Sequence, residues 1–423
     1  MSVTPRMLAV RQIFTTHAPI DLRATVQAQL ESRLRHLKPG ARIAVAVGSR
    51  GISNLSTIVA SLLKFLQSAG AQPFIVPAMG SHGGATPEGQ TQLLAEYGIS
   101  TEHIGVPIRA GMEAEHLGKT EDGVNVFFSR EALRSDGVIV VNRIKPHTDF
   151  SGLLGSGLVK MLVVGLGKRV GAANFHACAS RWGYEDVLRT SARITLRSAP
   201  ILAGLGIVEN QLHETAKVEL LLPEEIESRE EELFAQAKQW MPRLPIQDID
   251  LLIVDRLGKN ISGAGMDPNV IGRGVHGYSS LLSDRSLTPV IRRLFVRELT
   301  PETHGNATGI GLADLTTSRL VRQIDHTVTA INALTALAPQ SAKIPIHFET
   351  DREAIERALE SLALADTRQA KVVRIADTLS LEHLEASEAC LEELRRKAEL
   401  VTLGQCREMQ FDASHNLEPI AHS

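Results

Sequence analysis

The chain has 423 residues, of which 43% are hydrophobic, 22% charged and 4% aromatic, and its formal net charge is −3. This length suffices for two domains with separate hydrophobic cores. The slightly negative charge and the low aromatic content argue against the basic patches and base-stacking surfaces that bind nucleic acids. They also provide no attraction to anionic membranes, so we expect neither partner.

The three cysteines, Cys178, Cys390 and Cys406, form no C-x-x-C pair, and their odd number argues against a disulfide framework. The N-terminal residues lack the apolar segment of a signal peptide, and no apolar run approaches the roughly 20 residues of a membrane span. We therefore expect a protein of the reducing cytoplasm.

Strand-like and helix-like segments alternate through the first half of the chain. A helix is expected from Asn54 or Ser56 to Ser68, and another is expected to open at Thr86–Glu88, with a proline at its favoured first position. This alternation predicts a mainly parallel sheet with helices on both faces. The strands expected here are Ile43–Val47, Pro73–Val76, Val138–Val141 and Met161–Val164.

A charged helix, Pro223–Gln239, is followed by a proline-containing hinge at Trp240–Asp248 and then by a second set of α/β segments. We predict two Rossmann-like α/β domains, residues 1–243 and 244–423, with mainly parallel sheets and an active-site crevice between the domains. The second domain is expected to begin with strand Asp248–Val254 and to contain helices Thr288–Leu299, Thr327–Leu337, Asp351–Leu362 and Leu381–Glu399.

The segment from Asn142 to His176 concentrates residues that carry chemistry. It contains His147, Lys160 and His176 within a run rich in glycine and aliphatic residues, including Gly152, Gly155 and Gly157. A neutral imidazole can ligate a metal or act as a base near neutral pH. A lysine can bind an anion or bond covalently to a carbonyl-like carbon.

Three further polar residues follow β-like runs. Arg50 lies in a glycine turn, His82 is followed by two glycines, and Lys259 follows an apolar strand. Ligands of open α/β sheets bind outside the carboxyl ends of the strands, so these residues could meet at one crevice. Taken singly, each also has an ordinary interpretation as a turn, surface or ion-pairing residue.

Nucleotide and zinc motifs fit less well. Gly165, Gly167 and Gly171 depart from the G-x-G-x-x-G spacing, and no acidic residue follows at the expected place. Lys168 is not followed by the serine or threonine of a phosphate-binding P-loop, and H-E-x-x-H is missing.

Several motifs resemble those of the lactate racemase family, whose members use a nickel-pincer nucleotide. They are P-A-M-G-S-H-G-G-A-T-P-E-G-Q at Pro77–Gln90, I-K-P-H-T-D-F-S-G at Ile144–Gly152, and the lysine sixteen positions before His176. The resemblance runs from Arg42 into the second α/β unit. The segment Asp255–Asp267 is similar to a divergent branch of the family rather than to lactate racemase itself.

The resemblance implies a role for each matching residue. Lys160 would form a thioamide bond to the cofactor, a pyridinium-3-thioamide-5-thiocarboxylic acid mononucleotide carrying Ni. His176 would coordinate the nickel, whose other ligands are sulfur, carbon and sulfur from the pincer. The other implied cofactor-binding residues are Arg50, Ser49, Gly155 and Gly157.

The resemblance also implies a catalytic apparatus. His82 and His147 would be paired acid/bases, and Arg50 and Lys259 would hold the substrate carboxylate or the cofactor phosphate. The family's aspartate three positions before the arginine is Val47 here, and Ser49 or Asp149 could take its orienting role. The implied partners are a small 2-hydroxy acid and cofactor maturation enzymes.

The function so implied is a nickel-dependent racemase or epimerase that inverts C2 of a 2-hydroxy acid by hydride transfer. Two other hypotheses are open. The first is a nicotinamide-dependent 2-hydroxyacid oxidoreductase, which depends on Gly165–Gly171 as a nucleotide-binding segment. The second is a non-catalytic homologue that binds a carboxylate or a nucleotide. The sequence specifies neither the hydroxy acid nor the oligomeric state.

Overall fold

The structure is a computed structural model that describes residues 4–14, 20–34, 37–48, 51–148, 150, 152–274 and 289–420. The chain forms two compact units. We call Thr16–His147 with Ser151–Met241 the first unit, and Met1–Thr15, Thr148–Phe150 and Pro242–Ser423 the second unit.

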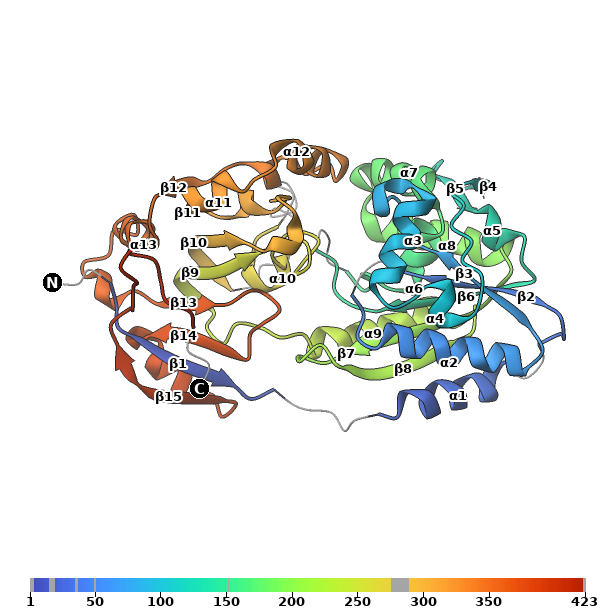
Figure 1. The fold of residues 1–423 in the computed structure, drawn as a ribbon, viewed down its shortest axis with the longest axis horizontal. Helices are drawn as coiled ribbons and strands as arrows, with labels where there is room; N and C mark the ends of the chain where they lie inside the picture. The colour runs from blue at the N-terminus through green and yellow to red at the C-terminus, as the bar shows by residue number, and fades with distance from the viewer. Residues whose placement is uncertain are drawn as a thin grey trace. The chain divides into compact units, whose positions relative to one another are not determined.

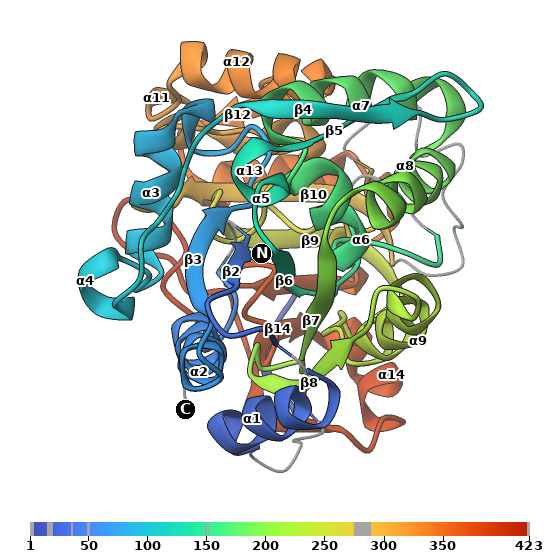
Figure 2. The ribbon, with the colours of Figure 1, turned by 90° about the vertical axis from the view of Figure 1, so that its right-hand side faces the viewer.

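The first unit is built on a five-stranded sheet in the order β3-β2-β6-β7-β8 (Figures 1 and 2). The first four strands of this order are parallel, and β8 pairs antiparallel with β7 at one edge. The strands are β2 (Arg42–Val47), β3 (Gln72–Pro77), β6 (Gly137–Arg143), β7 (Ile201–Glu209) and β8 (Thr215–Leu221).

Helices cover both faces of this sheet, because successive strand side chains point to opposite faces. Val45 and Val47 pack with helices α1 and α2, whereas Ala44 and Ala46 pack with α6, α7, α8 and α9. The bounds of these helices are α1 (Leu22–Arg33), α2 (Leu55–Ser68), α6 (Leu158–Lys160), α7 (Lys168–Trp182), α8 (Tyr184–Ser198) and α9 (Ile226–Gln239).

Shorter elements complete the first unit. Thr86 caps α3 (Pro87–Glu96), since its side chain accepts a hydrogen bond from Gly89 N at 3.1 Å. The others are α4 (Thr101–Ile104), the hairpin of β4 (Ala114–Lys119) with β5 (Asn125–Ser129), and α5 (Arg130–Leu133).

The second unit holds an eight-stranded sheet in the order β12-β11-β10-β9-β13-β14-β1-β15, parallel from β12 to β13 and antiparallel beyond. Strand β1 (Met7–Gln12), which the sequence analysis assigned to the first domain, pairs here with β14 and β15. The remaining strands are β9 (Asp248–Leu257), β10 (Val290–Leu299), β11 (Leu315–Thr317), β12 (Ile346–Phe348), β13 (Val372–Ile375), β14 (His383–Ser387) and β15 (Leu400–Arg407).

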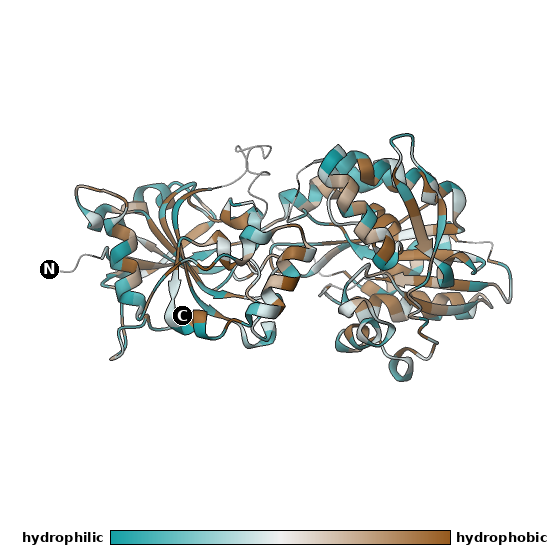
Figure 3. Cartoon of the chain, turned by 90° about the horizontal axis from the view of Figure 1, so that it is seen from above, coloured by the Kyte–Doolittle hydropathy of each residue, from teal (hydrophilic) through white to brown (hydrophobic). Residues whose placement is uncertain are grey.

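Hydropathy follows this layering: the central strands of each sheet are largely hydrophobic, and the helices mix hydrophobic and hydrophilic positions (Figure 3). No helix of the described residues is long and apolar enough to cross a membrane. The helices of the second unit are α10 (Pro268–Ile271), α11 (Ser318–Arg322), α12 (His326–Thr335), α13 (Asp351–Glu360) and α14 (Leu391–Arg395).

The predicted α/β class with mainly parallel sheets is confirmed, and the predicted crevice between domains stays a prediction. Three expected elements are wrong. Met161–Gly165 is a turn of π-helix rather than a strand, and all its residues are buried. Thr288 lies outside the described residues, and Val290–Leu299 is a strand parallel to β9 rather than a helix.

The third wrong element is the long helix expected at Leu381–Glu399. Its first part is strand β14, because Leu384 and Ala386 are buried in the sheet between β13 and β1. Only the short helix α14 follows, after a 3-10 turn at Glu388–Cys390. Burial in the sheet outweighs local helix preference in this segment.

A buried carboxyl group fixes the short helix α6. Glu230 of α9 has no exposed surface, and its Oε2 accepts a hydrogen bond from Val159 N at 2.9 Å. A Cβ atom on Gly157 would lie 1.9 Å from Glu230 Oε1, so only glycine fits beside this carboxyl group. Burial raises the pKa of Glu230 to about 8, although the backbone donors at Val159 and Leu158 oppose the shift.

We predict that Glu230 makes stability fall as pH rises. Because its pKa in the folded state is raised, the folded chain binds more protons than the unfolded chain between about pH 4.5 and 8. The free energy of unfolding should therefore decrease across that window, whereas Glu230→Gln does not titrate there. One pKa unit corresponds to about 1.4 kcal/mol. Between pH 5 and 8, the free energy of unfolding of Glu230→Gln should therefore increase relative to that of the wild type by at least about this amount.

Chemical denaturation of both proteins at pH 5, 6, 7 and 8 measures this difference. Glu224→Gln, an exposed position just before α9, is the matched control and should follow the wild-type curve. Parallel curves for wild type and Glu230→Gln would show that the buried carboxyl group does not titrate in this window.

Candidate active site

The candidate residues of the first unit follow strands that end at one level of the sheet. Val47, the last residue of β2, pairs with Pro77 of β3 on one side and with Val141 of β6 on the other. The loop with His82 follows β3, and the loop with His147 follows β6. The carboxyl edge of this sheet is thus the place where open α/β sheets bind ligands.

A small backbone bridge brings His147 to Lys160. Lys145 N donates to Ser156 O at 2.8 Å, and Ser156 N donates to Lys145 O at 2.9 Å. This pairing lays the chain before His147 alongside the chain that enters α6. As a result, the Lys160 Nζ and His147 Nε2 atoms are hydrogen-bonded, although thirteen residues separate them in sequence.

An aromatic cluster joins the second histidine of the segment. The ring centroid of Tyr184 lies 6.3 Å from that of His147 and 6.2 Å from that of His176. Phe175 packs edge-on against both Tyr184, at 5.7 Å, and His176, at 5.5 Å. Lys160, His147 and His176 therefore belong to one cluster with Tyr184 at its centre.

His147 is 7% exposed, whereas Lys160, His176 and Tyr184 are half-buried. The cluster is therefore partly accessible to solvent. A primary amine and two imidazoles side by side can bind an anion, ligate a metal or transfer protons.

Side chains of α8 and α9 hold the glycine-rich loop before Lys160. Glu185 accepts a hydrogen bond from Leu153 N at 2.9 Å, and Lys238 Nζ donates to Gly152 O at 3.1 Å. A Cβ on Gly155 would lie 2.4 Å from Lys145 O and 2.5 Å from Phe234 Cε2. Close packing thus explains both Gly155 and Gly157, and their expected contact with a cofactor stays a prediction.

His82 is exposed at the start of a one-turn 3-10 helix, Gly83–Ala85, ahead of α3. Its backbone is held at both ends: His82 N donates to Met79 O at 3.0 Å, and His82 O accepts from Gln90 Nε2 at 3.2 Å. The structure thus places His82 on an ordered turn at the carboxyl edge of the sheet.

The other expected site residues lie elsewhere. Arg50, Ser49 and Asp149 lie outside the described residues, so their predicted roles stay predictions. Lys259, in the loop after β9 of the second unit, donates from Nζ to Gly263 O at 2.5 Å, and its backbone N donates to Thr303 Oγ1 at 3.3 Å.

The glycines at 165–171 do not form a nucleotide-binding turn. Gly165 ends the π-helix, and a Cβ there would lie 2.6 Å from Ala78 O. A Cβ on Gly167 would lie 2.3 Å from Val163 O. No strand precedes these glycines, so the strand-turn-helix context of a dinucleotide site is missing in this described segment.

Across the described ranges, no group of three or more His, Cys, Asp or Glu side chains could hold a metal ion. A fully protein-ligated zinc or iron centre is thus not formed by these residues. A single imidazole such as that of His176 could still complete the coordination of a metal whose other ligands belong to a cofactor.

Sequence reasoning missed Tyr184 and Glu230 and dismissed Lys168. Tyr184 begins α8 directly after Gly183, whose φ of +91° lets the chain turn between α7 and α8. The position of the Tyr184 ring therefore depends on how these two helices pack, which no local motif indicates. Glu230 lies in a glutamate-rich helix, where nothing distinguishes a buried carboxylate from its solvated neighbours. In the structure, its hydrogen bond from Val159 N and its close approach to Gly157 connect it to the site.

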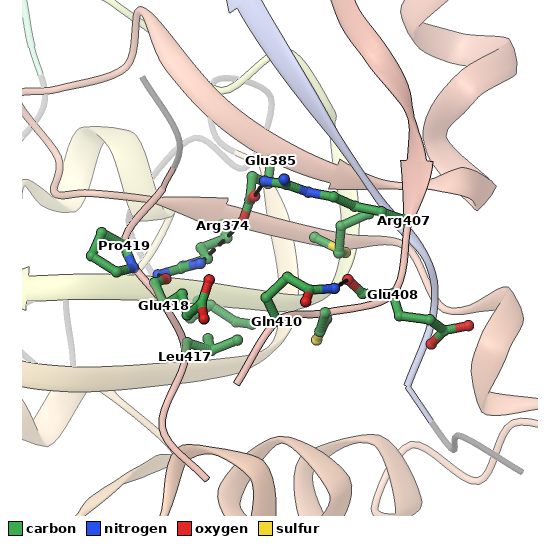
Figure 4. A pocket seen from close by; sticks show the side chains of 11 residues that line it. Arg374, Glu385, Arg407, Glu408, Gln410, Leu417, Glu418 and Pro419 are labelled. Carbon is green, nitrogen blue, oxygen red and sulfur yellow. Dashed lines mark hydrogen bonds and ion pairs between the residues drawn. The ribbon is translucent and has the colours of Figure 1, made fainter. Parts of the chain in front are cut away.

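A separate pocket in the second unit is lined by charged residues of β13, β14 and β15 (Figure 4). Arg374 pairs with Glu385 at 3.0 Å and with Asp255 at 2.9 Å, and Arg407 lies 3.6 Å from Glu385. These charged side chains pair with one another. None of the described candidate residues lines the pocket, so it is separate from the candidate site.

Two comparisons with known proteins give matches, one to a family model and one to a solved structure. Residues 21–183 match the family model of the lactate racemase N-terminal domain. The lactate racemase apoprotein from Thermoanaerobacterium thermosaccharolyticum is similar in structure, with a TM-score of 0.52 and 14% sequence identity over 88% of this chain and 93% of that chain. The comparison with curated proteins finds no match.

The matched residues 21–183 include His82, His147, Lys160 and His176, and the structural likeness shows a shared fold. The resemblance first seen in the motifs is therefore confirmed. Residues 21–183 are thus similar to the N-terminal domain of lactate racemase.

Proposed function

We propose that the protein is a racemase or epimerase that inverts C2 of a 2-hydroxy acid with the help of a nickel-pincer nucleotide. The observation that carries the proposal is the cluster of Lys160, His147 and His176 around Tyr184. The match of residues 21–183 to the lactate racemase N-terminal domain supports isomerase chemistry at the coarse level.

The residues present fit such a cofactor. A pincer nucleotide needs one primary amine for its covalent link and one imidazole for its metal, and Lys160 and His176 supply these groups from α6 and α7. The two lie in one cluster through His147 and Tyr184. When bound, the group supplies reversible acceptance of a hydride from C2, which leaves a planar carbon open to reduction from either face.

Two histidines serve as acid/bases in this proposal. His147 takes or returns the proton of the substrate hydroxyl group, since its buried imidazole lies beside Lys160. His82 performs the same step for the other enantiomer from the neighbouring strand-end loop. A reaction that runs in both directions is served by two bases that titrate near neutral pH.

The substrate carboxylate is assigned to Arg50 and Lys259. A guanidinium group can hold both carboxylate oxygens, whereas an ammonium group acts as a point charge. The proposal includes maturation enzymes that load the cofactor and places the protein in the cytoplasm. All three cysteines are free thiols, which fits a reducing compartment.

The first prediction of this proposal concerns His147. General acid–base catalysis typically contributes at least about 100-fold, so His147→Asn should lower kcat by that factor while the protein retains its nickel. The measurement is chiral chromatography of a panel of 2-hydroxy acids incubated with cofactor-loaded protein, together with elemental analysis.

His103→Asn is the matched control, since this exposed histidine lies on α4 in the same unit. It should leave kcat unchanged. Wild-type turnover by His147→Asn would remove His147 from the mechanism. Failure of the nickel-loaded wild type to invert any acid of the panel would count against the racemase proposal itself.

The second prediction concerns Tyr184, whose ring packs against both imidazoles. Tyr184→Phe keeps the ring and should leave the ring-carbon NMR signals of His147 and His176 near their wild-type positions. Tyr184→Ala removes contacts worth about 0.5–1.5 kcal/mol per aromatic pair and should shift both signals and weaken nickel retention. If Tyr184→Ala moves neither signal, the ring does not hold the two histidines together.

A further inference from the structure

Lys168 is a buried lysine that the proposed mechanism does not use. It is the first residue of α7, has no exposed surface, and adopts a left-handed φ of +56°. Such a backbone conformation is costly for a residue with a Cβ atom and persists where the surroundings fix it. Burial lowers the pKa of Lys168 to about 8, against the opposing charges of Glu131 and Glu113.

The ammonium group of Lys168 is aimed at the turn that carries His82. Its Nζ donates to Pro77 O at 2.8 Å and lies 3.5 Å from Gln90 Oε1. Pro77 is the last residue of β3, and the turn to His82 starts there. The buried ammonium group of Lys168 thus donates to the carbonyl group of Pro77, where this turn begins.

Gln90 extends the network to His82 itself. Its side chain, on α3, has no exposed surface, and Nε2 donates to Gly80 O at 3.1 Å and to His82 O at 3.2 Å. Together Lys168 and Gln90 therefore hold the main chain at three positions, Pro77, Gly80 and His82.

The same turn is also tied to the chain between Lys160 and His176. Gly80 N donates to Gly165 O at 3.0 Å. A Cβ on Gly165 would lie 2.6 Å from Ala78 O, and one on Gly80 would lie 3.1 Å from Val164 O. The turn and the end of the π-helix thus touch backbone to backbone, with no room for side chains between them.

We propose that Lys168 and Gln90 are positioning residues that fix His82 relative to the segment carrying Lys160 and His176. The two residues act through the main chain of the turn rather than on a substrate. Residues 160–176 thereby determine the positions of the Lys160 amine, the His176 imidazole and, in the neighbouring loop, His82. The catalytic consequence rests on the proposed function, whereas the positioning itself does not.

Gln90→Glu separates positioning from stability. The variant keeps the shape of the side chain and gives Lys168 a carboxylate partner, so the fold should be retained or stabilised. It loses the amide donor to Gly80 O and His82 O. In hydrogen exchange of the protein without substrate, the amides of Gly80 and His82 should exchange at least tenfold faster than in the wild type.

Lys168→Met tests the other end of the network and should also speed exchange at these amides. Gln92→Glu makes the same chemical change at an exposed position of α3 and is the matched control. It should leave the exchange rates and the thermal midpoint at wild-type values.

In cofactor-loaded protein, Gln90→Glu should lower kcat at least tenfold with nickel content unchanged. Faster exchange together with an inactive wild type would reject the proposed function and keep the positioning role. Unchanged exchange at Gly80 and His82 in both Gln90→Glu and Lys168→Met would overturn the positioning role, whatever the activity. Equal loosening across the whole first unit would also overturn it, since that result indicates a general structural role.

Discussion

The candidate site depends on the pair of backbone hydrogen bonds between Lys145 and Ser156. They fold a loop back so that the residues after β6 lie beside those that enter α6, and His147 meets Lys160 as a consequence. Backbone pairing of this kind needs no particular side chain, but it needs room for close approach. Gly155 provides that room, because a Cβ there would lie 2.4 Å from Lys145 O.

Buried polar side chains that hydrogen-bond to the main chain fix the rest of the site. Glu230 receives a hydrogen bond from Val159 N, and Lys168 donates to Pro77 O. A buried polar group without a hydrogen-bond partner is costly, so these main-chain hydrogen bonds help to retain both side chains. Glu230 and Lys168 thereby support α6, which carries Lys160, and the turn that carries His82.

The sequence predicted the parallel sheet and the helices on its faces, because hydrophobic periodicity is a local feature. It also singled out Lys160, His147 and His176 from their glycine-rich context, and the roles assigned to them stay predictions. The errors have a common physical origin. Met161–Val164 is apolar on every side, and such a run fits a buried helix turn as well as a buried strand. The helix predicted at Thr288–Leu299 depended on Pro289 as a first-turn residue, but eight residues of Val290–Leu299 pair with β9.

Tyr184 and Gln90 could not be found from the sequence, because their roles depend on contacts that only the folded chain brings about. Tyr184 matters for its contacts with His147 and His176, and Gln90 for its hydrogen bonds to the turn before it. The residues that would react are recognisable from sequence, since chemistry restricts their type. The residues that position them are not recognisable in this way. An amide, a carboxyl group or an amine can each hydrogen-bond to a main-chain carbonyl or N–H group from many positions in the sequence. A chain that diverges from similar proteins can therefore keep its reactive groups while the supporting hydrogen-bond network changes, and differences between such proteins should be sought first in that network.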